Sequence, residues 1–170
     1  MKRTTVILSI LGMLGCKTGS ALKTVPVLDI NKYAGTWYEI GRFPHSFEKS
    51  LNRVSATYEI KDNGKIKVLN VGYSKTDSTK KKEITGTAWV PNSQEPGKIK
   101  VQFFWPFAGD YWVIHIDEAY TEAVVGSPGL DYLWILSRNT EMAETDYQRL
   151  LQVAADAGFD TKRVERVKQK

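Results

Sequence analysis

The sequence of 170 residues has only one cysteine, Cys16, and only two histidines, His45 and His115. A lone cysteine cannot form a disulfide within the chain, and the Cys/His spacing of zinc sites is absent from the sequence. No Ser-His-Asp arrangement, nucleophile elbow or phosphate-binding glycine loop is visible. The sequence therefore does not indicate an enzyme, and we predict no catalytic residue, no metal site and no cofactor.

The excess of positive charge is also too small to indicate a nucleic-acid partner. The chain has 24 basic and 19 acidic residues, a formal net charge of +5. Its basic residues are dispersed, apart from the runs 80–82 and 162–170, and runs of that size are usually solvated faces. The apolar fraction of 42% is ordinary for a folded protein. A chain of this length suits one domain with a sizeable core.

The N-terminus has the pattern of a secretory signal. Lys2 and Arg3 precede the apolar segment 6–15, which is too short to span a membrane as a helix. Residues 13–16, with the sequence Met-Leu-Gly-Cys, resemble the lipobox of bacterial lipoproteins. In that family the cysteine is acylated and becomes the mature N-terminus.

This resemblance implies a signal peptide over residues 1–15, lipid attachment at Cys16, and a lipidated tether over residues 16–28. Lys17 follows the cysteine where an aspartate would favour retention, so the resemblance implies sorting to the outer membrane of a bacterial cell envelope. The alternative is a signal cleaved elsewhere, which would leave Cys16 as a free thiol.

Short β-rich segments alternate with turn residues over most of the chain, a pattern typical of an antiparallel sandwich or barrel. One turn, Asp62-Asn63-Gly64, is a strong hairpin signal because Asn and Gly accept a positive φ at little cost. We predict eight strands, at residues 36–42, 53–60, 65–74, 83–90, 98–104, 111–116, 120–125 and 131–137. Eight strands with short connections favour an up-and-down β-barrel that holds one small ligand.

One helix is predicted after the last strand, because apolar residues recur at helical spacing from Tyr147 to Ala157 and Gly158 is a favourable terminator. The segment 131–137 is apolar on both faces, so something must cover its outer face, and the helix is the candidate. The fold class is therefore all-β: an eight-stranded antiparallel barrel with one C-terminal α-helix packed outside. A last extended piece, 162–167, is expected against the sheet.

Strand alternation predicts which residues meet at one end of the barrel. The first strand begins at Gly35 and Trp37 where the last strand ends at Arg138, because neighbouring strands run in opposite directions. A guanidinium stacked on an indole contributes about 1–2 kcal/mol when desolvated. The turn with Asp117 and Tyr120 reaches the same end. We predict that these five residues form the closed floor of the barrel.

These motifs resemble those of the lipocalins, especially the bacterial outer-membrane lipoprotein lipocalins and apolipoprotein D. Gly35-Thr36-Trp37 matches the family's G-x-W motif, Asp117 and Tyr120 its second region, and Arg138 its third. The resemblance covers about residues 29–168 and implies a lipocalin domain over 29–170. The family's usual Thr-Asp-Tyr is here Ile116-Asp117-Glu118, a departure in the floor turn.

The lumen above this floor is expected to be apolar and aromatic, which suits an elongated hydrophobic ligand. Strand parity places Glu39 and then Gly41 on the face of Trp37. The inward face of segment 111–116 stays open. The residues predicted to contact ligand are Glu39, Phe43, Phe104, Tyr111, Val113, Tyr132 and Trp134.

The loop 43–50 is predicted to lie over the mouth, either as a lid in which Phe43 and Phe47 pack on the ligand or as a loop that anchors itself by these aromatics. Arg42, His45 and the lysines 80–82 are placed at the rim, where they could meet an anionic head group. The lipocalin resemblance implies a fatty acid or lysophospholipid as ligand. A homodimer, a purely structural envelope lipoprotein and a lipocalin-fold enzyme are left as alternatives.

Overall fold

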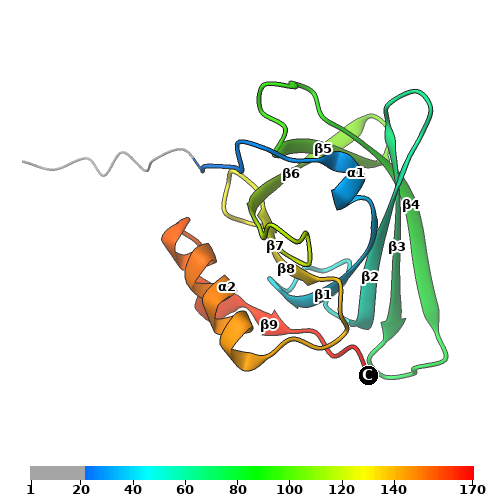
Figure 1. Ribbon diagram of the computed structural model, residues 1–170. Helices are drawn as coiled ribbons and strands as arrows, with labels where there is room; N and C mark the ends of the chain where they lie inside the picture. The colour runs from blue at the N-terminus through cyan, green and yellow to red at the C-terminus, as the bar shows by residue number, and fades with distance from the viewer. Residues whose placement is uncertain (1–21) are drawn as a thin grey trace, which may run out of the picture.

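The computed structural model describes residues 22–170 (Figure 1). The signal peptide predicted at 1–15 and the lipid attachment predicted at Cys16 lie outside the described residues. Among the described residues, no helix is long and apolar enough to cross a membrane.

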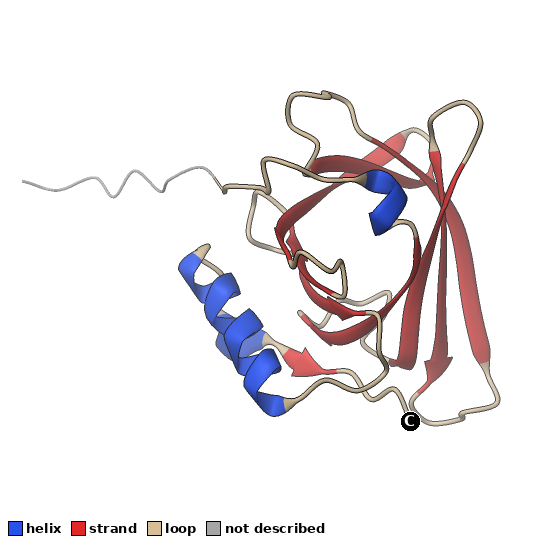
Figure 2. Cartoon of the chain, in the orientation of Figure 1, coloured by secondary structure: helices blue, strands red, loops and turns tan. Residues whose placement is uncertain are grey.

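Eight antiparallel strands close into a barrel, which confirms the predicted fold class (Figures 1 and 2). Each strand pairs with the next in sequence, and β1 pairs with both β2 and β8, so that no edge of the eight is left open. The strands are β1 (Gly35–Arg42), β2 (Leu51–Ile60), β3 (Ile66–Ser74), β4 (Lys81–Trp89), β5 (Lys98–Phe104), β6 (Phe107–Ile116), β7 (Glu122–Gly126) and β8 (Leu133–Ser137).

The predicted C-terminal helix is α2 (Glu144–Asp156), and it lies outside the barrel beside β7 and β8 (Figure 2). It ends before Gly158, whose φ of +99° is a backbone conformation that residues with a side chain rarely adopt. A 3₁₀ turn η1 (Thr161–Arg163) then leads into a short strand, β9 (Glu165–Arg166), which pairs with β1.

Sequence patterning did not reveal a second helix, α1 (Ile30–Tyr33), which lies across one end of the barrel (Figure 1). Its cap is Asp29, whose carboxylate accepts from the N–H groups of Asn31 and Lys32. Four residues are too few for a helical period, so only the cap could have signalled this turn. The helix directs Tyr33, which is fully buried, into the lumen.

Two large apolar cores, beside a small cluster of Leu51, Val54 and Val167, result from strands that are buried on both faces. The inner core fills the barrel, and the outer core lies between the barrel and α2. On β8, Leu136 belongs to the inner core, whereas Leu133 and Ile135 belong to the outer core. This division explains why the run 132–136 is apolar on both faces, because α2 covers its outer face.

The floor of the barrel has the arrangement that strand alternation predicts. The guanidinium carbon of Arg138 lies 3.9 Å from the centroid of the Trp37 ring. Arg138 also donates to the backbone carbonyls of Thr36 and Ala34, each at 2.8 Å, and the Trp37 indole donates to the carbonyl of Tyr33 at 2.8 Å. One arginine therefore ties α1 to the start of β1 and closes this end.

The turns around the floor are held by side chains that accept hydrogen bonds from backbone N–H groups. Asp117 accepts from the N–H groups of Thr121 and Glu122, each at 2.7 Å, and the hydroxyl of Tyr120 accepts from the N–H of Asp29 at 2.9 Å. Gly35 has a φ of +95°, and a Cβ there would lie 3.3 Å from the Arg138 guanidinium.

Candidate functional site

The inward-facing residues of β6 are Tyr111 and Val113, which both belong to the inner core. A bulge follows Val113, so that Ile114 packs in the outer core while Ile116 returns to the inner one. Strict alternation along β6 would not place Ile116 on the inner face together with Val113, since the bulge adds one residue between them. The predicted ligand contacts Tyr111 and Val113 therefore lie on the lumen wall.

Three tyrosine hydroxyls meet in the lumen above the floor. Tyr33 and Tyr111 are hydrogen bonded at 2.7 Å, and the hydroxyl of Tyr58 donates to that of Tyr111 at 2.8 Å. Burial raises the pKa of all three phenols above its ordinary value, so they stay neutral. Tyr33 and Tyr58 are lumen residues that were not predicted, although Tyr58 shares the parity of Ala56 on the second predicted strand, and both face the inner core.

A charged cluster occupies the opposite, open end. Arg42 is fully buried, and its guanidinium donates to the carboxylate of Glu39 at 2.9 Å. It also donates to the carbonyls of Glu48 at 2.6 Å and Leu51 at 2.8 Å, and to the Glu165 carboxylate at 3.2 Å. This arginine joins β1, the loop 43–50 and β9. Its donors are therefore directed at groups of the chain rather than at solvent.

A bulge in β1 explains why Arg42 faces inward although it was expected at the rim. Glu39 pairs with Leu136, Gly41 with Ile135 and Arg42 with Trp134, so one extra residue shifts the alternation. The predicted inward direction of Gly41 is wrong. A Cβ on Gly41 would instead meet the Tyr147 hydroxyl of α2 at 3.0 Å, outside the barrel.

Glu48, from the loop 43–50, lies at the mouth of the lumen and was not among the predicted site residues. It is buried, and its carboxylate accepts from the Trp134 indole at 3.1 Å. Burial raises the pKa of Glu39 above its ordinary value, and the nearby charge of Glu48 raises it further, against the opposing effect of Arg42. Burial also raises the pKa of Glu48. Two buried carboxyls beside one guanidinium favour retention of a proton by the pair.

Aromatic rings form a continuous series from the mouth to the floor. Successive ring centroids are 4.2 to 6.2 Å apart, distances typical of stacked or tilted aromatic pairs. The series runs through Phe47, His45, Tyr132, Trp134, Tyr111, Tyr58, Tyr33 and Trp37. Tyr111 and Trp134 face the inner core and are only partly buried. The lumen therefore presents an apolar wall with polar groups at both ends.

Two residues predicted to contact ligand are not on the lumen wall. Phe43 is fully buried in the outer core, edge-on to Phe159 at 6.1 Å and beneath the Arg163 guanidinium. The β1 bulge turns Arg42 inward and therefore Phe43 outward, so the prediction of Phe43 as a ligand contact and lid residue is wrong. Its backbone is held as well, since its N–H donates to the carbonyl of Leu133 at 3.0 Å.

Phe104 is the second such residue, since it is 69% exposed at the end of β5. The pairing of β5 with β6 is irregular between Val101 and Phe104, and Phe103 packs against the inner core instead. The prediction of Phe104 as a lumen residue is wrong for this reason. Tyr132 lies just before β8 at the mouth, 38% exposed and stacked on His45.

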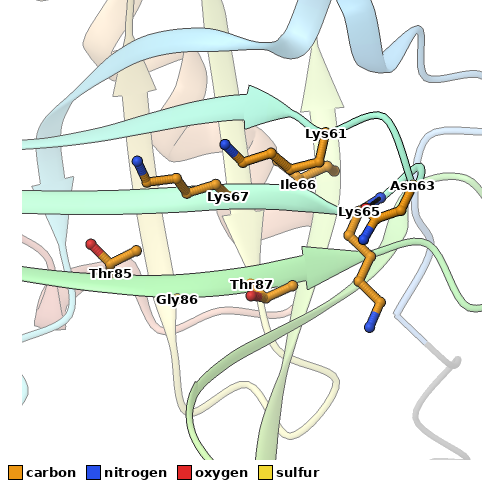
Figure 3. A pocket seen from close by; sticks show the side chains of 8 residues that line it. All are labelled: Lys61, Asn63, Lys65, Ile66, Lys67, Thr85, Gly86 and Thr87. Carbon is orange, nitrogen blue, oxygen red and sulfur yellow. Dashed lines mark hydrogen bonds between the residues drawn. The ribbon is translucent and has the colours of Figure 1, made fainter.

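A groove of about 290 Å³ lies elsewhere, on the outer face of β3 and β4 (Figure 3). Its lining includes Lys61, Lys65 and Lys67, and two of these lysines pair with the Glu59 carboxylate. It is separated from the lumen by the sheet itself. Within residues 22–170 there is no group of three or more His, Cys, Asp or Glu side chains that could hold a metal ion.

Comparison with known proteins identifies relatives over nearly the whole chain. The sequence profile described as a lipocalin-like domain matches residues 28–169. The outer membrane lipoprotein Blc of Citrobacter freundii is 39% identical over 160 residues, 92% of this chain and 90% of that protein. The protein of the same name from Escherichia coli K12 is 42% identical, over 83% of this chain and 79% of that protein.

Solved structures agree on the fold. Insecticyanin from the tobacco hornworm Manduca sexta superposes with a TM-score of 0.68 at 21% identity, over 86% of this chain and 84% of that one. At this identity the likeness concerns the barrel architecture alone.

These relatives also bear on localisation and activity. Both curated relatives are named as outer membrane lipoproteins, which confirms the predicted outer-membrane localisation. The matched family comprises binding and transport proteins rather than enzymes, which agrees with the prediction that this chain is not an enzyme.

Proposed function

The chain belongs to the lipocalin family, whose members bind small hydrophobic ligands, and we propose that its barrel holds one fatty acid or lysophospholipid. We further propose that a lipid on Cys16 anchors the protein at the outer membrane, where it stores or transports this ligand. The observation that carries the ligand proposal is the aromatic series, which lines the lumen from the mouth to Trp37.

An acyl chain suits this lumen because it needs apolar contact along its length and no hydrogen bonds. Trp134, Tyr111 and Val113 supply that contact on β8 and β6. The three tyrosine hydroxyls at the inner end are neutral and hydrogen bonded to one another. Burial beneath an acyl chain therefore leaves no charge and no hydroxyl without a partner. Trp37 and Arg138 belong to the floor and lie beneath the ligand.

The head group is placed at the mouth, where Arg42, Glu39 and Glu48 meet. An anionic carboxylate or phosphate would compete with Glu39 and Glu48 for the Arg42 guanidinium. A protonated Glu39 could donate to a ligand oxygen, since the raised pKa favours its neutral form. Movement of Glu48 with its loop would open the space that the head group needs.

Displacement of a fluorescent fatty acid from the delipidated protein tests this proposal, with native mass spectrometry to count bound lipids. We expect one ligand per chain, displaced by both fatty acids and lysophospholipids. Trp134→Ala should weaken binding by about tenfold or more, since a lumen aromatic of this size contributes roughly 1.5–3 kcal/mol. Trp112→Ala is the matched control, because Trp112 lies between Tyr111 and Val113 on the outer face beneath Lys98.

Failure of both lipid classes to compete, with no bound lipid in the mass spectrum, would instead support the structural lipoprotein alternative. Lipid attachment is tested separately by mass spectrometry of the protein extracted from membranes. Cys16→Ser should abolish the acyl mass and release the protein from the membrane fraction, whereas unchanged membrane attachment would contradict the anchor.

A further inference from the structure

Exposed aromatic side chains gather at one end of the barrel. Among the described residues, the exposed large apolar side chains are Val27, Phe47, Phe104, Trp105, Phe107 and Tyr132. All except Val27 lie at the open end, either on the loops β1–β2 and β7–β8 or at the tip of the β5–β6 hairpin. Trp105 is 86% exposed and Phe107 is 77% exposed, so these rings have little contact with the rest of the protein.

The topology fixes these loops at the mouth. β1, β5 and β7 all run from the floor, where β1 begins at Gly35, to the opposite end. The loops that follow them therefore open at the mouth, and they carry Phe47, the hairpin end 104–107 and Tyr132. Phe104 pairs directly with Phe107 across the hairpin, so the two rings are held by the sheet rather than by a free loop.

Exposed apolar side chains gathered at one end of a protein are typical of a site that contacts another protein or a membrane. Aromatic rings on a rigid support are typical of surfaces that enter the head-group region of a bilayer. The segment 74–83, which runs from the end of β3 to the start of β4 at the same end, has four lysines against two carboxylates, and three of these lysines pair with Asp77, Glu83 or Glu165. Its charge suits anionic lipid head groups.

We propose that the open end of the barrel docks on a lipid bilayer, with Phe104, Trp105 and Phe107 in the head-group region and the lysines of 74–83 above anionic lipids. The lumen then opens onto the bilayer surface, and a lipid can pass along Phe47, His45 and Tyr132 to Trp134 without crossing bulk water. This contact is made by the folded domain and does not depend on which lipid the lumen holds.

The length of chain before the barrel permits this orientation together with an anchor at Cys16. The N–H of Val25 donates to the carbonyl of Val113, midway along β6. The nine residues from Cys16 to Val25 reach at most about 30 Å when extended. The six residues from Val113 to the mouth at Phe107 span about 20 Å. An anchored chain can therefore bring the mouth to the bilayer.

Vesicle binding by the chain from residue 16 with Cys16→Ser tests the docking, because this protein keeps every described residue and carries no acyl chain. Vesicles of phosphatidylcholine, alone or with phosphatidylglycerol, are separated from free protein by flotation. We expect binding that strengthens with phosphatidylglycerol and weakens with salt. The double variant Phe104→Ser, Phe107→Ser should bind at least about tenfold more weakly, since two interfacial rings are lost.

Val27→Ser is the matched control, since Val27 is 73% exposed but lies in the segment leading to the floor. It should leave vesicle binding unchanged. Brominated acyl chains should quench wild-type tryptophan fluorescence, and Trp105→Phe should remove that quenching while it preserves binding. Fatty-acid displacement from the same variants in vesicle-free buffer distinguishes failure of the docking from failure of the lumen proposal.

The proposal is overturned if the wild-type domain does not float with either vesicle, or if Val27→Ser weakens binding as much as the double variant does. It is also overturned if sedimentation shows a wild-type dimer that the double variant dissociates while vesicle binding is absent, because the aromatics would then cover a second copy of the chain.

Discussion

Arg42 and Glu39 lie three residues apart on β1, and the Arg42 guanidinium donates to the Glu39 carboxyl at 2.9 Å inside the barrel. In a regular strand, residues i and i+3 point to opposite faces. The bulge between Glu39 and Gly41 puts both side chains on the inner face, and both are buried. A local irregularity of the backbone therefore creates the charged mouth of the lumen.

The buried pair leads to a prediction for stability. Arg42→Met should lower the free energy of unfolding by about 3–5 kcal/mol, because it leaves Glu39 and two carbonyls without their donor in the interior. Lys61→Met removes an exposed pair with Glu59 and should change the stability much less, because solvent screens this pair. Urea denaturation measures both, and similar losses in the two variants would contradict this account of Arg42.

The Glu39 carboxyl should make a contribution to stability that falls as the pH rises. The pKa of Glu39 is raised from 4.5 to about 8 in the folded chain, chiefly by burial. In this window the folded state binds more protons than the unfolded state, so the free energy of unfolding decreases with increasing pH. Glu48, whose pKa is also raised, acts in the same direction.

Urea denaturation of wild type and Glu39→Gln across this pH window measures the effect. Relative to wild type, the variant should gain stability as the pH rises through this window, because its amide does not titrate. Equal slopes in the two proteins would show that Glu39 ionises as readily when folded as when unfolded.

The floor gives a third prediction. Trp37→Ala should cost about 3–5 kcal/mol, because the indole is fully buried beneath Arg138 and its loss leaves a cavity. Trp105→Ala is the control and should change stability by no more than about 0.5 kcal/mol, since its ring is exposed. A small effect of Trp37→Ala in thermal or urea unfolding would mean that the floor collapses to refill the space.

Gly126 provides a test of the contact between the barrel and Phe159, which follows α2. A Cβ there would lie 2.5 Å from Phe159 and 2.9 Å from the carbonyl oxygen of Tyr132, so Gly126→Ala should destabilise the protein by about 1–3 kcal/mol through overpacking. Gly109→Ala meets nothing closer than 3.9 Å and should be nearly neutral. Urea denaturation measures the stability of both variants. Equal stability of Gly126→Ala and Gly109→Ala would show that Phe159 moves aside freely.

Alternation of side chains predicted most of the barrel correctly. The eight strands, the covering helix and the stacking of Arg138 on Trp37 follow from periods of two and 3.6 residues and from the order of strands. These features depend on residues that repeat regularly along the chain. The assignments that failed, Phe43, Phe104 and Gly41, all lie next to an irregularity in strand pairing, where one residue out of register reverses the face of those that follow.

The sequence by itself determined the antiparallel barrel, its floor and the apolar character of its lumen, because these follow from hydrophobic patterning that tolerates small errors of register. Only the tertiary structure decided which side chains reach the mouth. The bulge that turns Arg42 inward, the loop that brings Glu48 to Trp134 and the α1 turn that adds Tyr33 each depend on contacts between segments far apart in the chain. No local pattern encodes such contacts, since their energy exists only after the barrel has closed.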